Sequence, residues 1–135
     1  MSVVIDASVT LAWYFEDEAS PATDKLLDRI AEAGAVVPPL WRFEVGNGLQ
    51  MAIRRKRITA VYRDDALAEL AAMPIAIDPD ADAHAWTSTL RLSERFSLTL
   101  YDAAYLELAH RRALPIATLD GVMQTAAQDL DLDVL

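Results

Sequence analysis

The chain has 135 residues, with 12 Lys and Arg against 21 Asp and Glu, which gives a formal net charge of −9. This length fits a single domain, 1–135, and the absence of cysteine excludes disulfide frameworks, thiolate metal sites and cysteine nucleophiles. The negative charge argues against nucleic-acid binding through an extended basic face, and no apolar run approaches the roughly 20 residues of a membrane span. We therefore expect a cytoplasmic protein without a membrane segment.

Short apolar strands alternate with longer helical patterns along the chain. The predicted strands are 3–5, 35–37, 75–77, 116–118 and, as a fifth candidate, 132–135. The predicted helices are 9–15, 21–33, 41–56, 60–73, 80–96, 100–112 and 121–129. This alternation predicts an α/β fold with a central parallel sheet of four to five strands and helices on both faces. Helix 100–112 is apolar almost all round, so we expect it at the centre.

Residues that favour helix ends support these boundaries. Ser8 is expected to cap helix 9–15, and Ser20 followed by Pro21 is typical of a helix start. Gly34 is expected to end that second helix, and Thr59 to cap the fourth. The aromatic residues of the helical segments are expected in the core. They are Trp13, Trp41, Trp86, Tyr101 and Tyr105.

Four acidic residues fall where strands end or where the following helices begin. Asp6 closes the first strand, and Asp120 comes two residues after the fourth. Glu44 and Asp102 each lie in the first turn of a predicted helix. Because the carboxyl ends of parallel strands share one edge of a sheet, we expect all four acids there. Each acid alone also has an ordinary explanation, as an N-cap, a surface acid or an acid that stabilises the helix dipole.

Four carboxylates in one cleft repel one another unless cations neutralise them. A ligand set made only of oxygen selects hard cations, Mg²⁺ or Mn²⁺, and four negative charges balance two divalent ions. Two such ions can activate a water and stabilise the leaving oxygen of a phosphoryl displacement. Three polar residues near the acids are expected to support them: Ser8, Asn47 and Thr118. The pattern therefore favours metal-dependent hydrolysis of a phosphodiester.

Four stretches resemble the PIN-domain ribonucleases and, within them, the VapC-type toxins of toxin–antitoxin pairs. They are residues 4–8, 43–49, 100–109 and 117–120, in this order and over nearly the whole chain. The resemblance implies a Rossmann-like three-layer α/β/α sandwich that cuts RNA with Mg²⁺ or Mn²⁺. It implies acidic roles for Asp6, Glu44, Asp102 and Asp120. Supporting roles fall to Ser8, Asn47 and Thr118.

The cluster of acids leads to a hypothesis for how these residues divide the binding of two ions. Asp6, Glu44 and Asp102 would hold the first ion, and Asp120 would complete or position a second. In this family the fourth acid varies, and Gly121 here follows Asp120 where a polar residue is often found. Asp120 is therefore expected to bind its ion weakly or only together with substrate. The expected products carry 5′-phosphate and 3′-hydroxyl ends.

By the same resemblance the protein would be a homodimer whose partner is a VapB-like antitoxin. A tail of this antitoxin would lie along the toxin and cover the active site. The alternative is a catalytically inactive PIN-like domain that binds RNA or a protein, although such domains commonly lose one or more acids. A phosphatase or a phosphoacceptor receiver is disfavoured, because Ser8 stands where the former needs Asp and no Lys follows Lys56.

The sequence contains one basic run, at the end of predicted helix 41–56. Arg54, Arg55 and Arg57 could stabilise the carboxyl end of that helix or guide the RNA backbone toward the acids. The same two interpretations apply to Arg111 and Arg112 at the end of helix 100–112. The sequence leaves both alternatives open.

Overall fold

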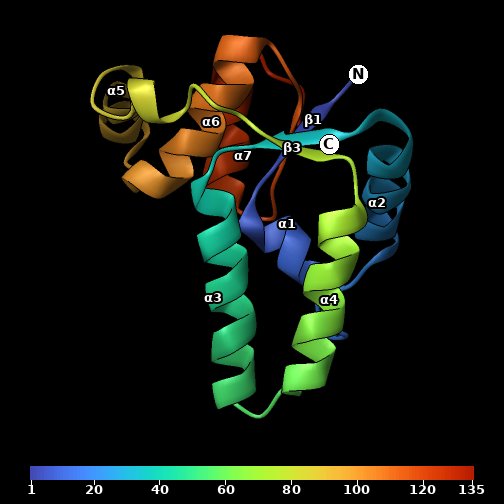
Figure 1. The fold of residues 1–135 in the computed structure, drawn as a ribbon. Helices are drawn as coiled ribbons and strands as arrows, with labels where there is room; N and C mark the ends of the chain where they lie inside the picture. The colour runs from blue at the N-terminus through green and yellow to red at the C-terminus, as the bar shows by residue number, and fades with distance from the viewer.

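The computed structural model describes all of residues 1–135 and is built around a four-stranded parallel sheet (Figure 1). Its strands are β1 (Val3–Ile5), β2 (Ala35–Val37), β3 (Ile75–Ile77) and β4 (Ile116–Ala117). They lie in the order β3-β2-β1-β4, so β1 is central, with every residue buried. The predicted α/β class is confirmed. The candidate fifth strand is reduced to an isolated bridge between Val134 and Ile116, in which Ile116 donates to the Asp133 carbonyl and accepts from the Leu135 amide.

Seven α-helices and one short 3₁₀ helix flank the sheet. They are α1 (Ala7–Ala12), α2 (Pro21–Ala33), α3 (Leu40–Arg54), α4 (Ala60–Ala72), η1 (Asp82–His84), α5 (Ser88–Phe96), α6 (Leu100–Arg112) and α7 (Gly121–Asp129). The caps predicted at Ser20, Gly34 and Thr59 are confirmed. The cap predicted at Ser8 is wrong, because Asp6 caps α1 and the helix begins two residues earlier than expected.

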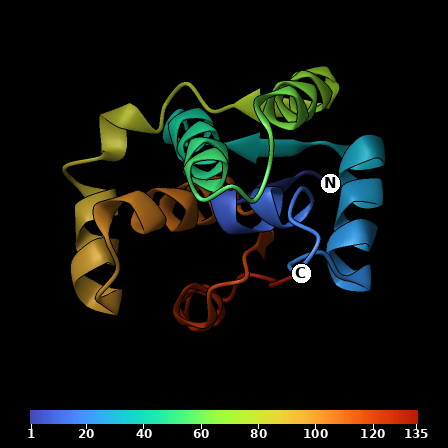
Figure 2. The same cartoon turned by 90° about the horizontal axis from the view of Figure 1, so that it is seen from below.

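The helices occupy distinct sides of the sheet. In Figure 1, α3 and α4 extend side by side below it, while α5 lies at the upper left and α2 at the right. Figure 2 shows α3 and α4 nearly end-on, with α2 and α5 at opposite sides of the molecule. Helix α6 packs against β1 and β4, and most of its residues from Ala103 to Ala109 are buried. None of the helices combines the length and the hydropathy that crossing a membrane requires.

The predicted helix 80–96 is wrong as one continuous element. The chain forms η1, leaves helical geometry at Thr87 (φ −119°, ψ −100°) and re-enters a helix at Ser88. Trp86 lies in this link and is 87 % exposed, so the helical spacing that placed it in the core does not apply. Tyr101 is also exposed, at 64 %, whereas Trp41 and Tyr105 are buried as predicted.

Two glycines permit close approaches between neighbouring segments. Gly34 has φ +80°, and a Cβ there would lie 3.1 Å from the carbonyl oxygen of Pro74. A Cβ at Gly48 would lie 2.5 Å from Leu11 Cδ1, so the missing side chain lets α3 pack directly on α1. This contact brings the helix that carries Glu44 against the helix that Asp6 caps.

Candidate active site

Asp6 lies at the carboxyl end of the central strand and is only 6 % exposed. Its Oδ1 accepts hydrogen bonds from the Ser8 hydroxyl (2.6 Å) and the Val9 amide (3.1 Å). Its Oδ2 accepts a hydrogen bond from the Thr118 hydroxyl. Each of these donors stabilises the ionised carboxylate. The side chain is therefore held in one orientation at the edge of the sheet.

The donors to Asp6 also fix the chain that leaves β4. The Ser8 hydroxyl accepts a hydrogen bond from the Leu119 amide (3.2 Å), and the Thr118 hydroxyl accepts one from the Asp120 amide (3.1 Å). This network ties the ends of β1 and β4 together, although their residues are more than 100 positions apart. It places Ser8 and Thr118 where the sequence predicted support for an acid.

Glu44 and Asp102 come from two helices that meet beside Asp6. Glu44 lies in the second turn of α3 and accepts a 2.6 Å hydrogen bond from the Tyr105 hydroxyl of α6. Asp102 lies in the first turn of α6, whose cap is Thr99, and it has no ion-pair partner. Tyr105 is one helical turn beyond Asp102 and is 1 % exposed, so one helix face carries an acid and the group that orients another.

Asp120 caps α7, where its Oδ1 accepts the Val122 amide (2.9 Å). Asp120 is therefore an N-cap, as one of the two interpretations of the sequence predicted. Its Oδ2 stays available to bind another group. A hollow of about 510 Å³ opens beside Asp120 and is lined by Phe96 of α5 together with Val122, Thr125 and Ala126. Asp120 thus stands at the wall of a cleft.

The four carboxylates act on one another through space. Burial, together with the charge of Asp120, raises the pKa of Asp6. The pKa of Glu44 is raised by burial and then by the charges of Asp102 and Asp6. Burial raises the pKa of Asp102 as well, followed by the charges of Asp120 and Asp6. The acids that the sequence predicted at one edge are therefore close enough to repel.

No arginine or lysine relieves this repulsion, because none of the ion pairs in the structure includes any of the four acids. The donor set, which is carboxylate and hydroxyl oxygen only, fits a hard divalent cation in its chemistry. No three acidic or histidine side chains, however, enclose a point where an ion could sit. Binding a cation at this edge therefore requires the acids to lie closer together than they do here.

Asn47 is placed differently from the other predicted supporting residues. It lies one turn beyond Glu44 on α3, but its side chain is exposed and forms no hydrogen bond within the chain. Its predicted role thus has no contact behind it here, in contrast to Ser8 and Thr118. A support for Glu44 exists instead in Tyr105, which the sequence indicated only as a core residue.

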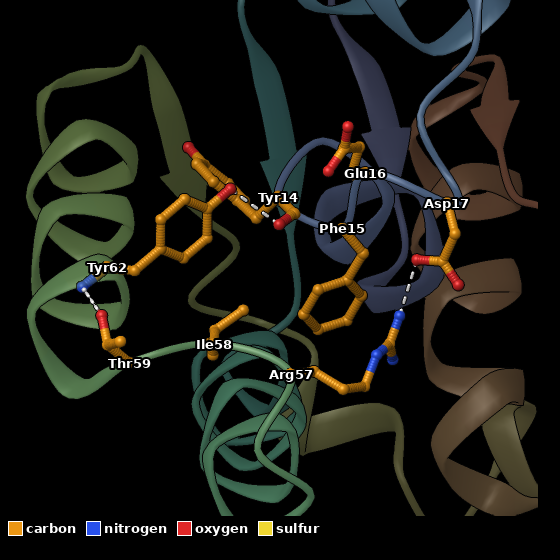
Figure 3. Close-up of a pocket in the computed structure, with 8 residues that line it drawn as sticks. All are labelled: Tyr14, Phe15, Glu16, Asp17, Arg57, Ile58, Thr59 and Tyr62. Carbon is orange, nitrogen blue, oxygen red and sulfur yellow. Dashed lines mark hydrogen bonds and ion pairs between the residues drawn. The ribbon is translucent and has the colours of Figure 1, made fainter.

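The basic run lies far from the acids, beyond the other end of α3. Ten residues separate Glu44 from Arg54, which corresponds to about 15 Å along the helix axis. Arg57 points into a hollow of about 650 Å³, where it forms an ion pair with Asp17 (2.7 Å) and covers the Phe15 ring (Figure 3). It forms a second ion pair with Glu18 (3.3 Å). Contact of Arg54, Arg55 and Arg57 with RNA stays a prediction. In this structure the Arg57 guanidinium is already paired with two carboxylates.

A buried charged cluster was not anticipated by the sequence. Asp78 and Glu107 are 2 % and 3 % exposed, and Arg111 binds both, at 2.6 Å and 2.7 Å. Arg112 approaches Asp78 at 3.7 Å. The two arginines at the end of α6 thus lock α6 to the residue that follows β3. The one signal in the sequence that could have indicated this cluster is the position of Asp78. Like Asp6, it is an acid directly after an apolar strand.

If Glu44 serves as a ligand of a catalytic cation, Tyr105→Phe is expected to lower kcat by about tenfold, as is typical when a group that orients a metal ligand is removed. The reason is that the Glu44 carboxylate loses its only fixed partner. The free energy of unfolding should fall by no more than about 1.5 kcal/mol, the net contribution of one hydrogen bond. Tyr101→Phe, which removes an exposed hydroxyl of the same helix, is the control, and equal kcat values for the two variants would refute the positioning role.

Comparisons with known proteins agree with this arrangement. The model of the PIN domain family matches residues 3–128. Ribonuclease VapC3 of Pyrobaculum aerophilum is 28% identical over 120 residues, which cover 89% of this chain and 90% of that protein. The resemblance found in the sequence is therefore confirmed at the level of the family.

Solved structures share the fold. The crystal structure of PAE2754 from Pyrobaculum aerophilum has a TM-score of 0.71 at 22% identity, covering 99% of this chain and 83% of that one. VapC20 of Mycobacterium tuberculosis, described as a sarcin–ricin loop cleaving toxin, has a TM-score of 0.62 at 17% identity, covering 93% and 95%. FitAcB from Neisseria gonorrhoeae also has a TM-score of 0.62, at 14% identity, covering 98% and 96%. With the family match over nearly its whole length, this chain belongs to the PIN domain family.

Proposed function

We propose that this protein is an endoribonuclease that hydrolyses RNA phosphodiesters with the help of Mg²⁺ or Mn²⁺. The observation that carries this proposal is the gathering of Asp6, Glu44, Asp102 and Asp120 at one sheet edge without a pairing cation. Membership of the PIN family and the name of the Pyrobaculum relative, Ribonuclease VapC3, support it. All four acids are present, which favours catalysis over an inactive binding domain.

The residues differ in how firmly they are held, which indicates their roles. Asp6 and Glu44 are fixed by hydroxyl donors, and together with Asp102 they would hold one ion. Asp120 would complete or position a second ion with the carboxylate oxygen that its capping role leaves available. Bound divalent ions lower the pKa of a water and offset the charge of the reacting phosphate. The network of Ser8 and Thr118 keeps Asp6 oriented toward that edge.

The direct test is cleavage of structured RNA by the purified full chain. We expect cleavage with Mg²⁺, none with EDTA, and none by Asp6→Asn, whereas Asp65→Asn, an exposed acid of α4 without an ion-pair partner, should cut normally. A hairpin of the sarcin–ricin loop, the RNA named for VapC20, belongs among the substrates. Products should carry 5′-phosphate and 3′-hydroxyl ends. Activity in EDTA, or 2′,3′-cyclic phosphate ends, would contradict the proposal.

We also infer that the protein is the toxin of a toxin–antitoxin pair and that a VapB-like antitoxin inhibits it. An apolar groove of about 320 Å³ between α3, α4 and β3 offers a surface for such a partner. It is lined by Trp41, Val45, Leu67, Leu70, Ile75 and Ile77, among others. An antitoxin tail that continued to the acids would place a basic side chain among them and so cover the active site.

Co-expression with the neighbouring short reading frame tests this assignment. We expect the two products to co-purify and RNA cleavage to be suppressed. Leu67→Asp, which puts a charge on the wall of the groove, should weaken the complex while free protein still cuts RNA. A homodimer of the free protein is part of the same proposal and is measured by light scattering. Lack of any complex would refute the toxin assignment but not the nuclease activity.

A further inference from the structure

A second hollow lies between η1, α5 and the carboxyl half of α6. Its volume is about 400 Å³, and basic side chains predominate in its lining. We call it the arginine pocket, defined by His84, Ser88, Arg91, Arg95, His110 and Arg111. Leu92 and Glu107 complete its walls. Three arginines and two histidines around one hollow run against the net charge of −9 of the whole chain.

The acids nearby neutralise only part of this pocket. Glu107 is paired with Arg111 and lies 4.0 Å from His84, and Asp78 is paired with Arg111 and Arg112. Arg91 and Arg95, in contrast, have no ion-pair partner anywhere in the structure. Both are exposed and lie one turn apart on α5, with the Arg95 guanidinium 4.7 Å from the centre of the Phe96 ring. The pocket therefore carries an excess of positive charge.

Arg111 supplies a fixed donor in the same hollow. Its guanidinium donates to Glu107 and Asp78, so it is held in one orientation, yet its side chain stays 22% exposed. A guanidinium has five N–H groups in a planar fork, and Glu107 and Asp78 accept four hydrogen bonds from Arg111, which leaves one N–H group for a further acceptor. Arginines arranged in this way are suited to the oxygens of a phosphate.

The pocket adjoins the acid edge. Helix α6 carries Asp102 at one end and Arg111 at the other, nine residues on, which is about 14 Å along the axis. Arg95 faces the arginine pocket, and the next residue, Phe96, lines the hollow beside Asp120. The two hollows thus share α5 as a common wall. A short run of nucleotides can reach from one to the other.

We propose that the arginine pocket binds a backbone phosphate of the RNA substrate, a few nucleotides from the bond that is cut. This inference rests on the proposed ribonuclease function. The site lies away from Arg54, Arg55 and Arg57 at the far end of α3. It includes Arg111, for which the sequence left backbone contact open, and it adds Arg91 and Arg95, which the sequence did not indicate. The pocket provides the positive potential that a strongly acidic protein otherwise lacks for a polyanion.

The test compares two double variants of the full-length protein that remove the same charge with the same spacing. The first variant, Arg91→Ala with Arg95→Ala, removes the two unpaired arginines of the pocket. The second, Lys25→Ala with Arg29→Ala, removes two exposed cations of α2 that lie one turn apart and have no ion-pair partners. Binding of a fluorescent single-stranded RNA is measured in EDTA, so that cleavage does not interfere. All four residues are exposed, and both variants should fold as the parent does.

We expect the Arg91/Arg95 variant to bind RNA about tenfold more weakly, the order of loss for charge-assisted contacts at an exposed site. The slope of log K against log salt should flatten by about 0.7, the contribution of one single-strand phosphate contact. With Mg²⁺, KM for cleavage should rise about tenfold while kcat stays within about twofold. The Lys25/Arg29 variant should match the parent in all three measurements.

The outcomes separate this inference from the function on which it rests. If no protein cuts RNA but only the Arg91/Arg95 variant loses affinity, the phosphate site stands and the nuclease function fails. If cleavage occurs and the two double variants behave alike, the inference is overturned. It is overturned as well if the Arg91/Arg95 variant binds RNA normally but no longer binds the antitoxin, because the pocket would then be a protein-binding site.

Discussion

Replacing Asp102 with Asn is expected to lower kcat for RNA cleavage by about 100- to 1,000-fold. The reason is that a ligand of the proposed ion stabilises the transition state by several kcal/mol, and each 1.36 kcal/mol changes the rate by a factor of ten. The same variant should raise the thermal stability of the metal-free protein. Asp102 caps no helix and forms no ion pair, and the net rise of its pKa means that burial and the charges of Asp120 and Asp6 outweigh its hydrogen bond with Thr99. Function and stability therefore change in opposite directions at this position.

The pH dependence follows from the direction of the pKa shifts. The pKa values of Asp6, Glu44 and Asp102 are raised in the folded protein, first by burial and then by the neighbouring acids. The folded state thus holds its protons more tightly than the unfolded state does. In EDTA, stability should fall as pH rises from the ordinary carboxyl range through the raised values, and the full penalty is present above them.

Thermal unfolding in EDTA between pH 4 and pH 8 measures this effect. At the upper end, Asp102→Asn should raise Tm by about 2 °C, a modest shift because partial exposure screens the repulsion. Mg²⁺ should raise the Tm of the parent protein through preferential binding to the folded state, and should do so much less for the variant. Asp65→Asn provides the matched loss of charge. If Asp102→Asn lowers Tm, or if the variant responds to Mg²⁺ as the parent does, the claim that the four acids repel one another and share a cation is refuted.

Arg111→Met is expected to destabilise the protein by about 3–5 kcal/mol, the cost of leaving buried acids without their cation. Asp78 and Glu107 are 2 % and 3 % exposed and depend on this guanidinium, whose own pKa is raised by its hydrogen bonds to them. Methionine keeps the unbranched apolar stem, so packing changes little. The loss corresponds to a fall in Tm of about 10–15 °C in a domain of this size, measured by calorimetry or circular dichroism.

Two comparisons separate the charge effect from a packing effect. Arg112→Met removes a guanidinium that is 45% exposed and lies 3.7 Å from Asp78, too far for a short hydrogen bond. The free energy of unfolding should therefore fall by less than about 1 kcal/mol. Adding Asp78→Asn and Glu107→Gln to Arg111→Met removes the unpaired charges and should restore most of the stability. If the triple variant is as unstable as Arg111→Met alone, the buried charges are not the cause.

Much of the local structure could be predicted from the sequence. The three-residue apolar runs became strands. Ser20 and Thr59 cap the starts of helices and Gly34 ends one, as their chemistry predicts, because these preferences depend on neighbours a few positions away. The edge on which the four acids gather was also predictable, since in a parallel sheet every strand ends on the same side. Local pattern failed at Trp86, where helical spacing was extended through a break in the helix.

The partner of each side chain was decided only by the tertiary structure. Asp6 and Asp78 both follow an apolar strand directly, yet hydroxyls bind the first and arginines bind the second. Tyr105 reaches Glu44 from a helix 61 positions away, and Thr118 reaches Asp6 from 112 positions away. The physical reason is that such contacts depend on how the helices pack across the sheet. That packing is determined by many long-range contacts together. A periodic pattern fixes which face of a helix is buried, but not which residue of another element meets it.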